Sequence, residues 1–109
     1  MTIFEKIIAG ELPCDKVFEN ERILAFRDIH PQAPVHILII PKKSIENAGS
    51  ASPEDQALLG EMVLVAQHIA QQEGLESFRL VTNSGEMAGQ EVFHLHFHLL
   101  GGRALGRLG

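Results

Sequence analysis

The most constraining feature of the sequence is a segment in which histidines and apolar residues alternate: His94-Leu95-His96-Phe97-His98-Leu99-Leu100. Successive side chains of a β-strand point to opposite faces of a sheet, so the alternation predicts a strand, which we place at 92–100. The three histidines are then expected on one face, with Leu95, Phe97 and Leu99 packed into the core on the other. This apolar backing would hold the imidazoles in place, unlike those of a flexible metal-binding tail.

Shorter β-branched and aromatic stretches predict further strands at 17–19, 23–28, 35–40 and 78–82, the first two joined by a tight hairpin at 20–21. Pro41 is expected to end the third of these strands, because proline has no backbone N–H to donate.

Two helices are expected. A short one follows Thr2 and ends before Gly10, and a long one starts at Ser52-Pro53-Glu54-Asp55, where a serine cap, a proline and two acids suit a helix N-terminus. Gly74 ends the long helix. Its expected apolar face comprises Leu58, Leu59, Met62, Val63, Val65, Ala66, Ile69 and Ala70, whereas Leu64 and His68 fall on its polar side. The pattern predicts an α+β fold of about five strands with one main helix packed on one face.

Length and charge exclude several classes of protein. The 109 residues suit a single domain covering 1–109, and a net charge of -5 argues against a nucleic-acid partner. The longest apolar run, 37–40, is far too short to span a membrane, and the N-terminus has no signal-peptide core. We therefore expect a cytoplasmic protein with no membrane partner. The only cysteine, Cys14, excludes an internal disulfide and a Cys-rich zinc site.

The histidine row has three interpretations: catalysis, metal binding, or satisfied core histidines. In a strand, the Cα atoms of His94 and His98 would lie roughly 13 Å apart, too far for all three rings to share one ion without a sharp bulge. No carboxylate or cysteine stands nearby in sequence at ligand spacing. Three buried imidazoles without function would need several partners to offset their desolvation. These arguments favour catalysis and predict no metal among the site residues.

Imidazole chemistry suits attack on phosphorus. A neutral ring is available near pH 7, and a second ring can supply a proton to the leaving group. The loop between Gly85 and Gly89, directly before the histidines, could offer backbone N–H groups to a phosphate.

Residues 94–100 resemble the signature of the histidine-triad (HIT) family, His-φ-His-φ-His-φ-φ with φ apolar. Further blocks resemble its Hint branch: 26–34, His36 with Ile39-Ile40-Pro41-Lys42-Lys43, and Gly89-Gln90-Glu91-Val92. The resemblance runs in order from residue 2 to residue 103. It implies a five-stranded antiparallel sheet that continues across a homodimer into ten strands. It also implies hydrolysis of nucleoside 5′-phosphoramidates, AMP linked to an amine or a lysine, through a nucleotidyl-histidine intermediate and without a cofactor.

The resemblance also implies a role for each matching residue. His96 is the nucleophile, His98 contacts the phosphate and leaving group, His94 supports the row, and His36 lies near it. The remaining matches contact the ribose and base (Asp28, Ile29), line the base pocket (Phe4, Phe26), or lie at the phosphate (Asn83, Gly89, Gln90, Glu91). Transferases of the family resemble the same pattern with Gln in place of His98, so the histidine here favours hydrolysis.

Several alternatives stay open from sequence. Asp28 could be a turn acid, Phe26 a core residue and His36 a structural histidine. Some relatives carry Ser at Glu91, which could act as an acid, orient a histidine or restrict access to anionic substrates. His30 replaces a frequent Ser and has no functional account, and the short tail after Arg103 leaves substrate preference open. A second hypothesis is a nucleotide-binding regulatory or scaffold protein with incidental hydrolysis, but an intact His96 favours the enzyme.

Overall fold

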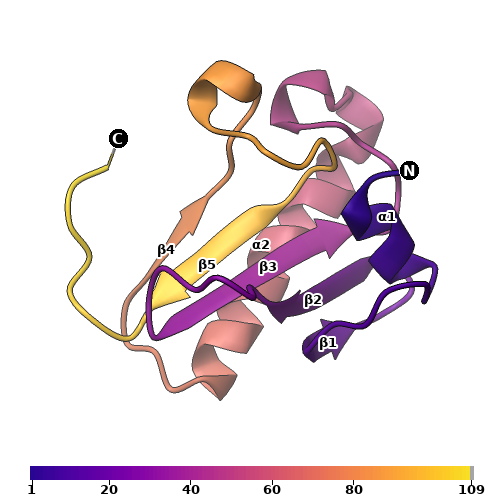
Figure 1. The fold of residues 1–109 in the computed structure, drawn as a ribbon. Coiled ribbons are helices and arrows are strands. Elements are labelled where there is room, and N and C mark those ends of the chain that lie inside the picture. The colour runs from indigo at the N-terminus through magenta and orange to yellow at the C-terminus, as the bar shows by residue number, and fades with distance from the viewer. Residues whose placement is uncertain (109) are drawn as a thin grey trace.

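The computed structural model describes residues 1–108. Its sheet is built around β3 (Val35–Pro41), the β-branched run predicted from sequence. β2 (Ile23–Arg27) and β5 (Phe97–Gly101) flank this strand, and β1 (Lys16–Glu19) and β4 (Phe78–Val81) form the edges. The order is β1-β2-β3-β5-β4, and every neighbouring pair is antiparallel (Figure 1). The expected α+β architecture of five strands and one main helix is confirmed.

The main helix, α2 (Gln56–Gln72), covers one face of the sheet and lies behind it in Figure 1. Burial of apolar surface on both sides holds this layer together. The helix contributes Met62, Val65, Ala66 and Ile69 to the core, and the sheet side contributes Ile37, Ile39, Leu95 and Leu99. The predicted face was too broad in one place, because Val63 is 47% exposed. Leu64 and His68 are exposed, as predicted.

The start of α2 differs in detail from the expected serine cap. A 3-10 turn, η2 (Pro53–Asp55), precedes the α-helix. The accepting oxygen belongs to Asp55, whose carboxylate receives the Ser52 N–H at 3.0 Å and the Ser52 hydroxyl at 3.3 Å. Gly74, which follows the helix, adopts a φ of 71°, a left-handed conformation that suits glycine at a helix end.

The opposite face of the sheet carries the short helix α1 (Ile3–Ile8). Thr2 Oγ1 accepts the Glu5 N–H at 3.1 Å while Glu5 Oε1 accepts the Thr2 N–H at 2.9 Å, so the helix begins with a complete capping box. Beneath it lies a second apolar cluster, made of Phe4, Leu24, Phe26, Leu38 and Ile40. The alternation of β3 therefore splits its side chains between two cores, and His36, Leu38 and Ile40 belong to the face that α1 only partly covers.

The predicted strand at 92–100 is wrong at its N-terminal end, because strand pairing begins only at Phe97. The register pairs Ile39 with Phe97, so a longer ladder would set Leu95 opposite Pro41. Proline has no N–H to donate, and the Pro41 carbonyl is occupied by the His94 ring at 2.7 Å. The Leu95 N–H donates instead to the Ile45 carbonyl at 2.7 Å. His94 and His96 thus belong to an irregular segment that leads into β5.

Two further 3-10 turns, η1 (Ala48–Ser50) and η3 (Glu86–Ala88), lie in the connections around α2 and before β5. None of the helices within residues 1–108 is long and apolar enough to cross a membrane.

Candidate active site

A cavity of about 640 Å³ opens on the face of the sheet that carries α1. Its walls come from α1, the end of β2, the β2–β3 turn and the loop before β5. The structure brings most of the predicted site residues together here: Phe4, Phe26, Asp28, Ile29, His36, Asn83, Gly89, Glu91, His96 and His98 all line the cavity. The two predicted residues that do not line it are His94 and Gln90, both buried behind its wall.

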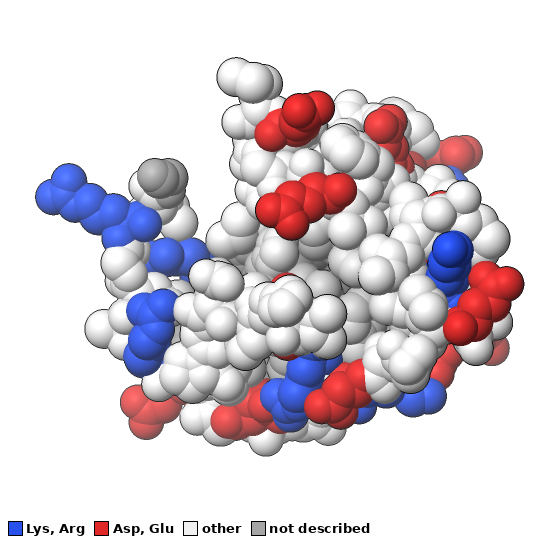
Figure 2. Space-filling view, viewed as in Figure 1, with Lys and Arg blue, Asp and Glu red and all other residues white. Residues whose placement is uncertain are grey.

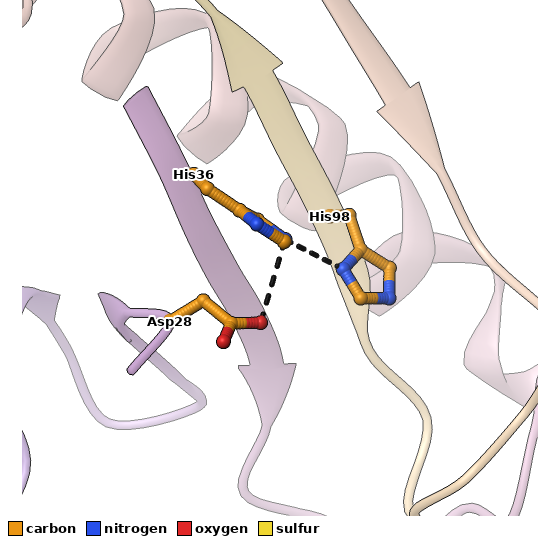
Figure 3. A group of neighbouring side chains, drawn as sticks. All are labelled: Asp28, His36 and His98. Carbon is orange, nitrogen blue, oxygen red and sulfur yellow. Dashed lines mark hydrogen bonds and ion pairs between the residues drawn. The ribbon is translucent and has the colours of Figure 1, made fainter. Parts of the chain in front are cut away.

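Three of these side chains converge from neighbouring strands, as Figure 3 shows. His36 on β3 and His98 on β5 point toward each other, with His36 Nε2 lying 2.9 Å from His98 Nδ1. Asp28, just past the end of β2, places Oδ2 3.4 Å from the same His36 nitrogen. Asp28 and His36 are opposite one another in the hairpin, where the Asp28 N–H donates to the His36 carbonyl. Strand register therefore creates this cluster.

The hydrogen-bond network assigns the protons of the His36–His98 pair. The backbone N–H of Gln32 donates to His36 Nδ1 at 3.0 Å, so that nitrogen is unprotonated and the neutral ring carries its proton on Nε2. His36 then donates to His98 Nδ1. His98 in turn must carry its own proton on Nε2, where it is available to a bound molecule. The geometry thus presents His98 as a hydrogen-bond donor to the cavity.

The hydrogen-bond partner of His96 likewise shows which of its ring nitrogens carries the proton. Its Nδ1 lies 2.7 Å from the carbonyl oxygen of His94, which can only accept, so Nδ1 carries the proton and Nε2 keeps a free electron pair. The ring centroids of His96 and His98 are 5.0 Å apart. The neighbouring His94 ring donates to the Pro41 carbonyl, which anchors the irregular segment to the end of β3. A nitrogen with a free electron pair and an N–H hydrogen-bond donor therefore lie side by side.

Burial keeps these rings neutral. Desolvation lowers the pKa of His36 and of His96, although Asp28 opposes the shift at His36 and the His94 carbonyl opposes it at His96. For His98, burial together with the neighbouring His96 and His36 lowers the pKa to about 4. A neutral imidazole is the form that acts as a nucleophile or donates a single N–H at pH 7.

One end of the cavity is aromatic. The rings of Phe4 and Phe26 meet edge to face with centroids 5.6 Å apart, and Phe4 meets His96 in the same way at 5.0 Å. Both phenylalanines also belong to the second apolar cluster, so Phe26 is a core residue and a cavity residue together. Ile29 is 84% exposed at the mouth. Asp28 likewise combines two roles, because its Oδ1 accepts the His30 N–H at 2.8 Å in a turn while its other oxygen faces His36.

The loop between β4 and β5 was expected to offer backbone N–H groups to a phosphate, but several of these groups are already occupied. The N–H groups of Gly85, Ala88, Gly89 and Gln90 all donate within the loop itself. Gln90 is 3% exposed and its amide is engaged by Gly85, Asn47, Glu46 and Val92, so it holds the loop together rather than facing the cavity. Asn83 and Gly89 do line the cavity.

The structure also corrects the expectation that no carboxylate accompanies the histidines. Asp28, His36 and His98 have ligand atoms that all lie within 4.8 Å of one another, which is close enough for one divalent ion. Asp28 is far from the triad in sequence, and only the β2–β3 hairpin register could have signalled its approach. In the structure the two facing nitrogens of His36 and His98 share a hydrogen bond.

Sequence reasoning missed some residues of the site. Leu38 lines the cavity because it shares a face of β3 with His36, a signal that the alternation of the strand already contained. The Thr82 hydroxyl donates to the His96 carbonyl at 2.7 Å, a contact that no sequence pattern indicated. His30 and Gln32 also line the cavity. His68 is exposed on α2, as predicted, and its ring lies beside that of Phe18, with centroids 5.9 Å apart.

Comparison with known proteins identifies a single family. The HIT domain model matches residues 9–105. The chain is 58% identical over 105 residues to an uncharacterized HIT-like protein of Synechococcus elongatus, covering 95% of this chain and 92% of the relative. It is 51% identical over 107 residues to the purine nucleoside phosphoramidase of Escherichia coli K12, covering 96% and 90%. The crystal structure of a HIT family hydrolase from Legionella pneumophila superposes with a TM-score of 0.95 at 49% identity, covering 97% and 96%.

Proposed function

The chain belongs to the HIT domain family, whose matched members include hydrolases, and we propose that it hydrolyses nucleoside 5′-phosphoramidates by cleaving the P–N bond at the α-phosphate. The substrate class is supported by the relative named purine nucleoside phosphoramidase at 51% identity. The observation that carries the mechanism is the pairing of an unprotonated His96 Nε2 with a protonated His98 Nε2 at the same cavity. This arrangement provides a nucleophile and a hydrogen-bond donor to the phosphate without a cofactor.

In the first step His96 Nε2 attacks the α-phosphorus and forms a P–N bond. The bond between phosphorus and the amine breaks, and its electron pair goes to the amine nitrogen. That nitrogen takes a proton from solvent at the exposed rim, so the product leaves as a neutral amine, while the neutral His98 ring donates its Nε2–H to a phosphate oxygen. The His94 carbonyl stabilises the positive charge that develops on the His96 ring, because it accepts the Nδ1–H at 2.7 Å.

In the second step water attacks the phosphorus of the nucleotidyl-histidine. The attacking water gives up a proton to solvent as its oxygen bonds to phosphorus, and His98 stays neutral. The P–Nε2 bond then breaks, and the nucleoside monophosphate leaves with His96 restored. His36 holds Nδ1 of His98 as an acceptor throughout, so the same Nε2–H faces the phosphate in both steps.

The nucleoside is proposed to occupy the aromatic end. Phe4 and Phe26 offer an apolar wall for a base, and Ile29 at the mouth can cover it. The Asp28 carboxylate, whose side chain is 19% exposed, can accept hydrogen bonds from ribose hydroxyls. Asn83 and Gly89 then lie at the phosphate end with the two catalytic histidines.

We also propose a homodimer in which two five-stranded sheets join into one of ten strands. An edge strand leaves backbone N–H and C=O groups unpaired, and β4 is such an edge. It carries Phe78, which is 42% exposed, and α2 carries Val63 and Leu64, which are 47% and 63% exposed. These exposed apolar side chains suit an interface with a second copy.

Covalent trapping tests the proposal. The protein is mixed with AMP linked to a simple amine, quenched in the early turnovers and digested, and the nucleotide adduct is located by mass spectrometry. The expected adduct lies on His96. His96→Ala should lose both adduct and turnover, because no other residue supplies the attacking nitrogen.

His68→Ala is the matched control, since it removes an exposed histidine of α2 far from the cavity wall. It should keep wild-type turnover. Binding of AMP without any turnover by the wild type would favour the nucleotide-binding regulatory protein instead. Full activity of His96→Ala would refute the mechanism.

A further inference from the structure

Glu91 is a carboxylate on the cavity wall that the proposed mechanism does not use. It is exposed and lines the cavity together with His96 and His98. It belongs to the loop that also supplies Gly89, which the proposed function places at the phosphate. Within residues 1–108 its carboxylate forms no ion pair. Its charge therefore acts on whatever occupies the cavity.

The described residues that line the cavity offer no unpaired lysine or arginine. Among the described residues that line it, Arg27 is the single lysine or arginine, and its guanidinium is held by both oxygens of Glu73 at 2.9 and 3.1 Å. The lining histidines His36, His96 and His98 are neutral at pH 7, because burial lowers their pKa values.

Acidic side chains outnumber lysine and arginine among the described residues that line the cavity. Asp15 and Asp28 line the cavity with Glu91, and Asp15 lies near Arg27, at 3.8 Å. Figure 2 shows acidic side chains on the rim above the hollow in the centre of this face, while basic ones lie at the left edge and along the lower and right edges. A phosphorus-bound group that departs on the Glu91 side thus leaves through a negative potential.

We propose that Glu91 selects substrates by the charge of the leaving group: it favours amines that carry a second, protonated nitrogen and disfavours leaving groups that carry a phosphate or carboxylate. This inference rests on the proposed hydrolysis of phosphoramidates. In-line attack by His96 places the departing nitrogen on the opposite side of phosphorus, away from the buried wall and toward the exposed rim. A cation a few bonds farther along the leaving group then comes within range of an unpaired carboxylate.

Three AMP conjugates of equal length test this selection. AMP is joined through nitrogen to 1,4-diaminobutane, to pentylamine or to 5-aminopentanoate, so that the far end is cationic, neutral or anionic. For the wild type, kcat/KM is expected to be about tenfold higher for the cationic than for the anionic conjugate, the effect of one partly screened charge pair. In Glu91→Gln this ratio should fall to within about threefold, and 0.5 M NaCl should reduce the wild-type ratio because salt screens exposed charges.

Glu86→Gln is the matched control, because Glu86 is an exposed acid of the same loop that does not line the cavity. It should keep the wild-type ratio. A wild-type ratio near one would overturn the inference. So would a ratio that Glu91→Gln leaves unchanged while slowing all three conjugates equally, which would mark Glu91 as part of the chemistry. An equal fall of the ratio in both variants would assign the selection to the overall field of the loop.

Binding separates this inference from the proposed function. In a His96→Ala background, where hydrolysis is blocked, calorimetry gives Kd for each conjugate with Glu or Gln at position 91. Tighter binding of the cationic conjugate that depends on Glu91 supports the selection even if the wild type hydrolyses none of the three. Hydrolysis of all three with no dependence on charge in either assay would leave the proposed function standing and remove the selection.

Discussion

Nε2 of His36 lies 2.9 Å from Nδ1 of His98, and this contact between neighbouring strands determines which nitrogen of His98 faces the cavity with a proton. The Gln32 N–H fixes the His36 tautomer from behind, and both rings are held by strand pairing between β3 and β5. A residue outside the triad signature therefore sets the protonation of one inside it. Its removal should affect the chemical step more than nucleotide binding.

His36→Leu tests this relationship. Leucine fills the space but cannot donate to His98, so His98 can adopt the tautomer that has no N–H toward the phosphate. We expect kcat to fall about 100-fold, within the usual range for loss of one hydrogen-bond donor at the reacting group, with a smaller change in KM. His36→Gln offers an amide N–H at a similar distance and should recover part of kcat. Equal kcat values for the two variants in steady-state assays would contradict this role.

The buried rings also predict how stability depends on pH. His98 has a pKa of about 4 in the folded chain, against about 6.5 when unfolded. Between these values the unfolded chain binds a proton that the folded chain does not. The free energy of unfolding should therefore fall as the pH drops from 6.5 toward 4, by at most about 1.4 kcal/mol per pH unit for this group. Above pH 6.5 this contribution is fully present.

Urea unfolding of the wild type and of His98→Gln at several values between pH 7 and pH 4.5 measures the effect. The variant cannot take up this proton, so its stability should decline less steeply than that of the wild type. Carboxylates titrate in both proteins, and their contribution cancels in the comparison. Parallel pH profiles would show that His98 does not resist protonation in the fold.

Gln90 is expected to control the loop that borders the cavity. Its buried amide accepts the Gly85 N–H at 2.8 Å and donates to the Glu46 and Val92 carbonyls at 2.8 and 3.0 Å. Gln90→Leu would leave these backbone groups without their partner, and we expect a loss of about 2–3 kcal/mol in urea unfolding, because unsatisfied buried groups cost about 1–3 kcal/mol each. Gln67→Leu, at an exposed position of α2, should change stability by less than about 0.5 kcal/mol. Equal stability of the two variants would contradict the role of Gln90.

The proposed dimer makes Leu64 a sensitive position. If α2 lies at the interface, Leu64→Glu places a charge on apolar surface and should shift the protein toward the monomer. Light scattering at micromolar concentration should give twice the 12.0 kDa chain mass for the wild type and values approaching 12.0 kDa for the variant. Gln67→Glu adds the same charge at another exposed position of α2 and should remain dimeric if it lies outside the interface. A wild-type mass of 12.0 kDa would refute the dimer.

Local patterns were enough to predict the elements of the fold. The short helix after Thr2, the helix start at Ser52 and the β-branched run at 35–40 are all found close to their predicted positions. These signals depend on neighbouring residues alone. The faces of Leu95 and Leu99 were also predicted correctly, because the alternation of side chains persists where strand pairing does not.

The wrong predictions concern features that depend on residues far apart in the sequence. The beginning of β5 depends on Pro41, which lies far away in sequence and ends the ladder on the neighbouring strand. The approach of Asp28 to His36 depends on hairpin register, and the internal hydrogen bonds of the loop at 85–90 depend on the burial of Gln90. A pattern read along one segment contains none of this information.

Along the segment that enters β5, residues facing the cavity alternate with residues facing the α2 core, so catalysis and folding depend on different side chains within a few positions of each other. Loss of the proposed nucleophile at His96 leaves Leu95 and Leu99 in place beneath the cavity. Under the proposed function, one substitution would thus separate nucleotide binding from hydrolysis without removing a residue of the α2 core.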